Sequence, residues 1–94
     1  MKVIDLLKKA LSHWGIDMQA GMLNEEMAEL TIAVNKYRRK PNKITKAAVA
    51  EEIADVRIML EQIELAFKIT PEQKAYWRKH KLYKLERLIE HGRR

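Results

Sequence analysis

Apolar residues recur at steps of three and four along most of the chain, a spacing that predicts amphipathic helices. The expected helices span residues 3–14, 17–39, 45–68 and 71–90. Gly15 ends the first helix, Asp17 is the expected N-cap of the second, and Pro41 interrupts the pattern after it. Thr70-Pro71-Glu72-Gln73 has the features of a helix start, with a threonine cap and a capping box. No stretch alternates like a strand, so the pattern predicts an all-α fold.

The second and third expected helices carry apolar seams with heptad-like spacing. In the second helix the seam consists of Leu23, Met27, Leu30 and Val34. In the third helix it consists of Ile53, Val56, Leu60, Ile63 and Phe67. Seams of this kind pack antiparallel helices, so we expect the two helices to face each other through them. A second apolar stripe, of Ile32, Ile58 and Leu65, exceeds what one small core needs and predicts a partner subunit.

Two pairs of carboxylates accompany the seams. Glu26 and Glu29 each precede a seam residue of the second helix, and Glu52 and Asp55 do the same in the third. Residues three apart lie on one face of a helix, and the two pairs occupy equivalent heptad positions. Four converging carboxylates repel one another unless a cation neutralises them. One such pair alone would usually be a solvated face, but two matched pairs favour a metal site.

The types of ligand indicate which metal ion the site would bind. Oxygen ligands without histidine or cysteine favour Mg²⁺, with Mn²⁺ as the alternative, over zinc. Di-iron centres of helical bundles use Glu-x-x-His pairs, and His13, His80 and His91 all lie outside the acidic pairs. The sequence therefore predicts a magnesium site at Glu26, Glu29, Glu52 and Asp55, of a kind suited to phosphate chemistry.

The composition of the chain indicates the number of domains, the cellular compartment and the kind of partner. The 94 residues suffice for one domain, spanning residues 1–94, and no apolar run approaches the ~20 residues that cross a bilayer. Without such a run we expect no membrane partner. The chain also has no cysteine and therefore no disulfide, so we expect a cytoplasmic protein. The net charge of +6 indicates a polyanionic partner. The candidate substrate-binding residues are Gln19, Lys36, Arg39, Lys81, Lys84 and Arg87. Gln19 could equally be a polar surface residue, and for each lysine or arginine alone a solvated face is the commoner explanation.

The succession of Trp14-Gly15, Gln19, Glu25-Glu26-x-x-Glu29-Leu30 and Glu51-Glu52-Ile53-Ala54-Asp55-Val56 resembles the MazG-like all-α nucleoside triphosphate pyrophosphohydrolase superfamily. The likeness covers about residues 13–90 and is strongest to short single-domain members of bacteria and phages. It implies a four-helix bundle completed by oligomerisation as a homodimer or homotetramer. It also implies hydrolysis of a nucleoside triphosphate between the α and β phosphates. The resemblance makes Glu26, Glu29, Glu52 and Asp55 the metal ligands and catalytic residues.

Other interpretations stay open. Phosphoribosyl-ATP pyrophosphatase is the alternative within the same superfamily, and a member that binds nucleotide without turnover is another. A non-catalytic, basic nucleic-acid-binding or regulatory module would suit the tail His91-Gly92-Arg93-Arg94, although we expect a nucleotide rather than a nucleic acid as the partner. The resemblance also suggests Gln19 and Trp14 as contacts to the base. Related proteins often carry an asparagine in the last helix where this chain has Leu85, so the preferred base is not predicted.

Overall fold

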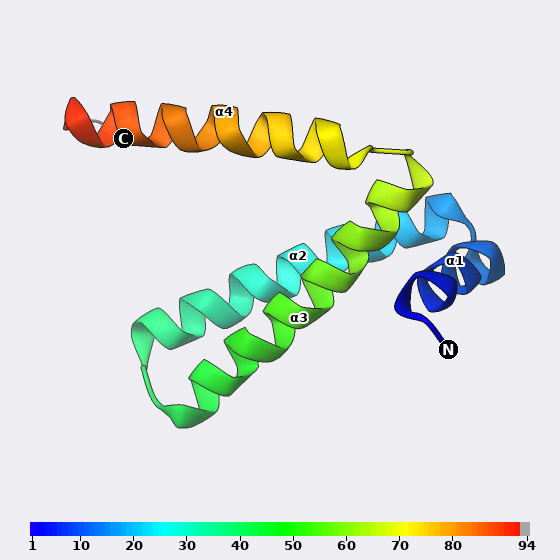
Figure 1. Ribbon diagram of the computed structural model, residues 1–94. Coiled ribbons are helices and arrows are strands. Elements are labelled where there is room, and N and C mark those ends of the chain that lie inside the picture. Colours follow the sequence, from blue (N-terminus) through cyan, green and yellow to red (C-terminus); the bar gives the residue numbers. More distant parts are fainter. Residues whose placement is uncertain (93–94) are drawn as a thin grey trace.

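The computed structural model describes residues 1–92 and consists of helices (Figure 1). The helices are α1 (Val3–Trp14), α2 (Ile16–Arg39), α3 (Lys43–Ala66) and α4 (Pro71–Glu90). No strand occurs within residues 1–92, which confirms the all-α prediction. No helix in this part of the chain has the length and apolarity required to cross a bilayer. The last two residues of the basic tail, Arg93 and Arg94, lie outside the described residues.

Side-chain caps fix where α3 and α4 begin. The Thr70 hydroxyl accepts a hydrogen bond from the Gln73 amide at 3.1 Å, and the Gln73 side chain accepts one from the Thr70 amide at 2.8 Å. This is the predicted capping box. Asn42 and Thr45 form a second box ahead of α3, which therefore begins at Lys43, slightly earlier than expected.

The junction of α1 and α2 differs from the prediction in one respect. Gly15 takes a φ of 91° and serves as both the C-cap of α1 and the N-cap of α2. Glycine adopts this backbone conformation without the steric penalty of a Cβ atom. Because α2 starts directly at Ile16, Asp17 lies within its first turn and does not cap it. There the negative charge of Asp17 still interacts favourably with the positive end of the helix dipole.

α2 and α3 form an antiparallel hairpin, and α1 contacts both helices near one end of it (Figure 1). The buried apolar core of the described residues is small and consists of Leu7, Ala33, Val56 and Met59. α4 leaves the end of α3 and packs along none of the other three helices. The radius of gyration is 16.4 Å, whereas a compact chain of this length has about 12 Å. The chain is therefore unusually extended for its size.

The interface between α2 and α3 is rotated relative to the predicted seams. The residues that the hairpin buries are Gln19, Ala33, Val56, Met59 and Gln62. The seam residues that keep 37–58% of their surface exposed are Met27, Val34, Ile53, Leu60 and Phe67. The expectation that these five would pack α2 against α3 was wrong. In each helix, apolar residues lie on both sides of the acidic ones. Their spacing alone therefore could not identify which apolar stripe contacts the other helix.

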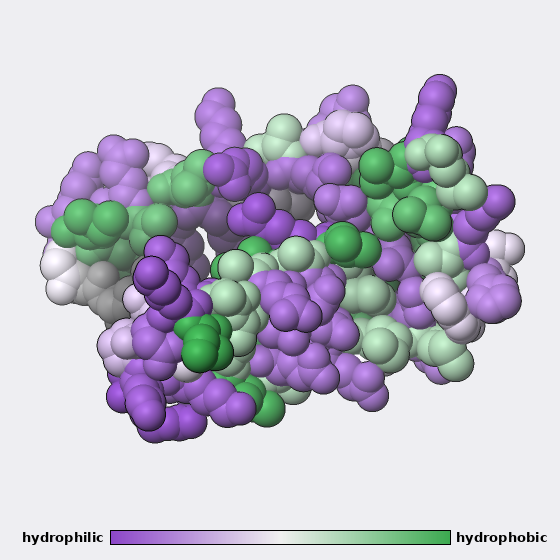
Figure 2. Space-filling model, turned by 90° about the horizontal axis from the view of Figure 1, so that it is seen from below, coloured by the Kyte–Doolittle hydropathy of each residue, from purple (hydrophilic) through white to green (hydrophobic). Residues whose placement is uncertain are grey.

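The second predicted stripe is divided between two environments. Leu65 is half-buried and lines a cavity of about 450 Å³ together with Ile4 and Leu7 of α1. Ile32 and Ile58 remain 54% and 48% exposed. α1 thus occupies part of the surface that the sequence assigned to a partner subunit. Apolar side chains nevertheless reach the surface in several separate patches, shown in green in Figure 2.

A buried amide pair joins the two helices of the hairpin. The Gln19 Nε2 atom donates to Gln62 Oε1 at 2.7 Å, and the two residues are only 5% and 4% exposed. Gln19→Leu is expected to lower the free energy of unfolding by about 1–3 kcal/mol, because it strands the buried Gln62 carbonyl. Gln19→Leu combined with Gln62→Leu should recover most of that loss, since neither polar group then remains. Urea unfolding of both variants tests this expectation; equal losses in the single and double variants would contradict it.

Candidate metal centre

Three carboxylates converge at the middle of the α2–α3 hairpin. One carboxylate oxygen from each of Glu26, Glu52 and Asp55 lies within 4.8 Å of the other two. Glu26 projects from α2, and Glu52 and Asp55 project from the same face of α3, as their spacing of three residues predicts. All three side chains are half-buried. The group could hold a metal ion through oxygen ligands alone, which favours a hard cation.

Two of the carboxylate oxygens lack a partner. Within residues 1–92, Oε2 of Glu26 and Oε2 of Glu52 are buried without a hydrogen bond. Leaving a buried polar atom unsatisfied usually costs about 1–3 kcal/mol, and more when the group is charged. A cation placed between the two helices would satisfy both oxygens, and so would a proton shared between the carboxyl groups. The two possibilities differ in how they respond to pH.

The Glu52 carboxyl has a raised pKa. The pKa of Glu52 is raised from 4.5 to about 7, chiefly by desolvation and also by the adjacent Glu26 carboxyl group. The negative charges of Glu29, Glu26 and Asp55 contribute to the same rise. A carboxyl group surrounded by other carboxylates holds its proton until a positive charge replaces it. The local electrostatics of the site therefore favour binding of a cation.

Glu29 lies beside the three-carboxylate group and is not a member of it. Its charge reaches Glu52 strongly enough to raise the pKa of that residue. Glu29, Glu52 and Lys36 also line one cavity of about 240 Å³ between α2 and α3. The cavity therefore combines two carboxylates with a lysine, and the predicted role of Glu29 as a metal ligand stays a prediction.

The remaining predicted site residues lie elsewhere. Gln19 is buried against Gln62, and Arg39 is the exposed last residue of α2. The exposed α4 residues Lys81, Lys84 and Arg87 belong to a helix that does not pack against α2 or α3. Within one chain the structure therefore does not bring these α4 cations together with the carboxylates. Their part in substrate binding stays a prediction.

Gln62 is the polar residue of this interface that the sequence interpretation missed. Gln19 precedes Glu26 by one heptad, and Gln62 follows Asp55 by one heptad. In an antiparallel hairpin, a step of seven residues back along one helix and a step of seven residues forward along the other lead toward the same end of the hairpin. The two amides therefore meet about two helical turns from the carboxylates. That symmetric spacing is visible in the sequence and could have identified the pair.

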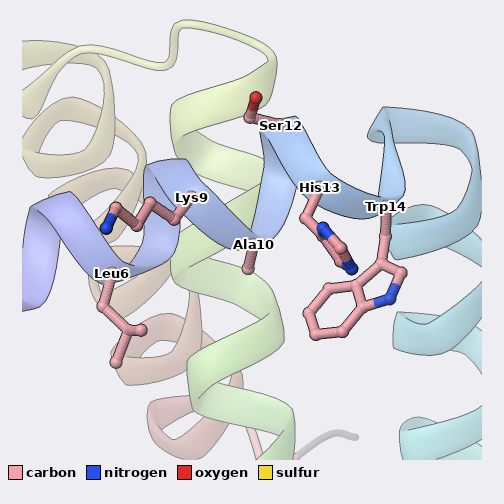
Figure 3. A pocket seen from close by; sticks show the side chains of 6 residues that line it. All are labelled: Leu6, Lys9, Ala10, Ser12, His13 and Trp14. Atoms are coloured by element: carbon pink, nitrogen blue, oxygen red, sulfur yellow. The ribbon is translucent and has the colours of Figure 1, made fainter.

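A larger surface cavity, of about 640 Å³, lies on α1 (Figure 3). Its lining residues are Leu6, Lys9, Ala10, Ser12, His13 and Trp14. The rings of His13 and Trp14 meet edge to face, with their centroids 4.9 Å apart. None of the clustered carboxylates lines this cavity. It is therefore distinct from the candidate metal centre, and a contact between Trp14 and a base stays a prediction.

Comparisons with known proteins add no identification. A scan against protein-family models finds no match, and searches of curated proteins and of solved structures find none either. Residues 1–92 form an all-α chain of four helices with a Glu-Glu-Asp group that could hold a metal ion.

Proposed function

We propose that the protein is a Mg²⁺-dependent nucleoside triphosphate pyrophosphohydrolase of the MazG-like type, acting in the cytoplasm. The observation that carries this proposal is the convergence of Glu26, Glu52 and Asp55, two of which have a buried oxygen without a hydrogen-bond partner among residues 1–92. Carboxylates in this arrangement suit Mg²⁺, with Mn²⁺ as an alternative, better than softer metals. The expected products are a nucleoside monophosphate and pyrophosphate.

Each side chain has a distinct role in the proposed reaction. Glu26, Glu52 and Asp55 hold the cation, which neutralises charge on phosphate oxygens and helps to orient water. Glu29 lies beside this group, where its carboxylate can accept the proton of the attacking water. The water oxygen forms a bond to phosphorus as the bridging bond between the α and β phosphates breaks. Lys36 lines the same cavity and provides positive charge for a phosphate group.

The test is product analysis with a panel of ribo- and deoxyribonucleoside triphosphates, in Mg²⁺, in Mn²⁺ and in EDTA. Metal-dependent release of equal amounts of monophosphate and pyrophosphate is the expected result. Release only from phosphoribosyl-ATP would assign the chain to the histidine-biosynthesis alternative. If neither the panel nor phosphoribosyl-ATP is cleaved, the proposal is wrong. Salt-dependent binding of nucleic acid without hydrolysis would then support the basic-module interpretation.

A further inference from the structure

The aromatic residues of α4 lie on one side of the helix, together with basic residues. Successive residues of an α-helix are about 100° apart around its axis. On that basis a face about 120° wide, called here the aromatic face, contains Tyr76, Trp77, His80, Tyr83, Lys84 and Arg87. The three glutamates of α4 lie outside this face, although Glu72 and Glu90 border it at the two ends of the helix. The aliphatic residues Leu82, Leu85 and Ile89 lie on the opposite side.

The aromatic face points away from the rest of the chain (Figure 1). At the first turn of α4, Pro71 and Lys74 line a cavity together with residues of α1 and α3. Lys74 also forms an ion pair with Glu64 at 3.1 Å. Around the helix, Pro71 lies opposite the middle of the aromatic face, and Lys74 lies about 120° from it. The chain therefore contacts α4 from the other side and leaves the aromatic face to solvent.

The rings of the aromatic face form one ordered group. Tyr76 and Trp77 stack with their centroids 5.0 Å apart and their planes at 11°. The ring of His80 meets both of them edge to face, at 6.2 Å from Tyr76 and 5.7 Å from Trp77. Tyr76, Trp77 and Tyr83 nevertheless remain 56%, 55% and 57% exposed. Exposed aromatic surface gathered in one place is typical of an interaction site.

Positive charges lie directly beside these rings. The Arg87 guanidinium lies over the ring of Tyr83, 5.9 Å from its centroid, and Arg87 Nη1 donates to the Tyr83 hydroxyl at 3.3 Å. Lys79 borders the face and lines a surface hollow of about 330 Å³ with Tyr76, His80 and Tyr83. Sites for small ligands usually measure about 300–1,000 Å³. The face therefore offers rings for stacking, a hollow of suitable size and cations for phosphate groups.

The combination of rings and cations determines which ligand fits. Aromatic rings also bind cationic ligands, but Lys79, Lys84 and Arg87 would repel these. A helix that enters a membrane surface does so by its apolar side, and the aliphatic side chains lie on the other side of α4. A nucleic-acid strand presents both a negative backbone and flat bases. Bases within a duplex stack on each other, whereas those of a single strand are free to stack on aromatic side chains.

We propose that the aromatic face of α4 binds single-stranded nucleic acid, with bases stacked on its exposed rings and phosphates paired with its cations. From Tyr76 to Arg87 the face is about 17 Å long, which accommodates about five nucleotides at the 3.4 Å spacing of a stacked strand. Lys84 and Arg87 thereby take a role other than the substrate binding expected from the sequence. Because α4 does not pack against α2 or α3, this inference does not depend on the proposed hydrolysis.

Fluorescence anisotropy of a labelled oligonucleotide of about 12 nucleotides, DNA or RNA, tests the proposal with the full chain in EDTA. Single strands should bind at least roughly tenfold more tightly than the duplex of the same sequence. Trp77→Ala combined with Tyr83→Ala should weaken binding by about 25-fold or more, because each stacked base contributes at least about fivefold. Phe67→Ala is the matched control, since Phe67 is 58% exposed and lies outside α4. Absence of binding, equal binding of the duplex, or unchanged affinity of the aromatic double variant would overturn the proposal.

A second pair of variants separates this face from the general positive charge of α4. Lys84→Gln with Arg87→Gln removes two charges from the aromatic face, and Arg78→Gln with Lys81→Gln removes two from outside it. The first pair should lower the affinity at least about fivefold more than the second and reduce its salt dependence more strongly. Equal losses would show that binding follows net charge alone and would refute the proposal. Binding to phosphatidylserine vesicles without binding to either oligonucleotide would refute it in favour of a membrane surface.

Discussion

Asp55→Ala is expected to remove Mg²⁺-dependent pyrophosphate release, with a loss of at least roughly 1000-fold in kcat. Asp55 supplies one of the three converging oxygens, and a cation at such a site contributes several kcal/mol of charge stabilisation to the transition state. The fold should survive, because the substitution removes one of the negative charges that repel one another in the metal-free protein. Helix content by circular dichroism and product release by chromatography are the two measurements.

Glu51→Ala provides the matched control for this experiment. Glu51 is exposed, precedes Glu52 on the same helix and is not a member of the three-carboxylate group. Its substitution should leave hydrolysis within about twofold of the wild type, as is usual for surface changes away from a site. Full turnover by Asp55→Ala would show that the carboxylate group is not the catalytic site. Equal losses in both variants would show that the effect is not specific to the group.

Mg²⁺ affinity is expected to fall about tenfold between pH 8 and pH 6. The pKa of Glu52 is raised to about 7, and Glu52 must lose its proton before it can bind the ion. Titration calorimetry at the two pH values, in buffers of different ionisation enthalpy, measures both the affinity and the proton released. Glu52→Gln should bind Mg²⁺ weakly at both values. Identical wild-type affinity at pH 6 and pH 8 would contradict the assignment.

The same group makes the stability of the metal-free protein depend on pH in the opposite sense. Between pH 4.5 and 7 the folded state holds a proton on Glu52 that the unfolded chain has released. The contribution of Glu52 to stability is therefore fully present below pH 4.5 and is lost as the pH rises through 7. In EDTA, the urea midpoint of the wild type should be lower at pH 8 than at pH 5. Glu52→Gln should reduce that difference.

Structural features that depend only on neighbouring residues were predicted correctly from the sequence in most cases. The capping box of Thr70 and Gln73 and the positive φ of Gly15 depend on residues within one turn of each other. Their chemistry can therefore be predicted without knowing the rest of the fold. The spacing of Glu52 and Asp55 likewise places both carboxylates on one face of α3. Asp17 shows the limit of this approach, because Gly15, two residues before it, ended one helix and capped the next.

The sequence by itself determined that the chain is helical, where its helices begin and end to within about two residues, and which acidic residues share a face. Tertiary structure decided which stripe of α2 meets α3, because apolar residues flank the carboxylates on both sides and two rotations were compatible with the pattern. That choice drew Glu26, Glu52 and Asp55 into the interface, left Glu29 beside it and buried Gln19 against Gln62. It also exposed five of the nine residues expected to form the seams, whereas Val56 of the same seams is buried. Periodicity specifies a helix face, but only the packing of one helix on another determines what that face contacts.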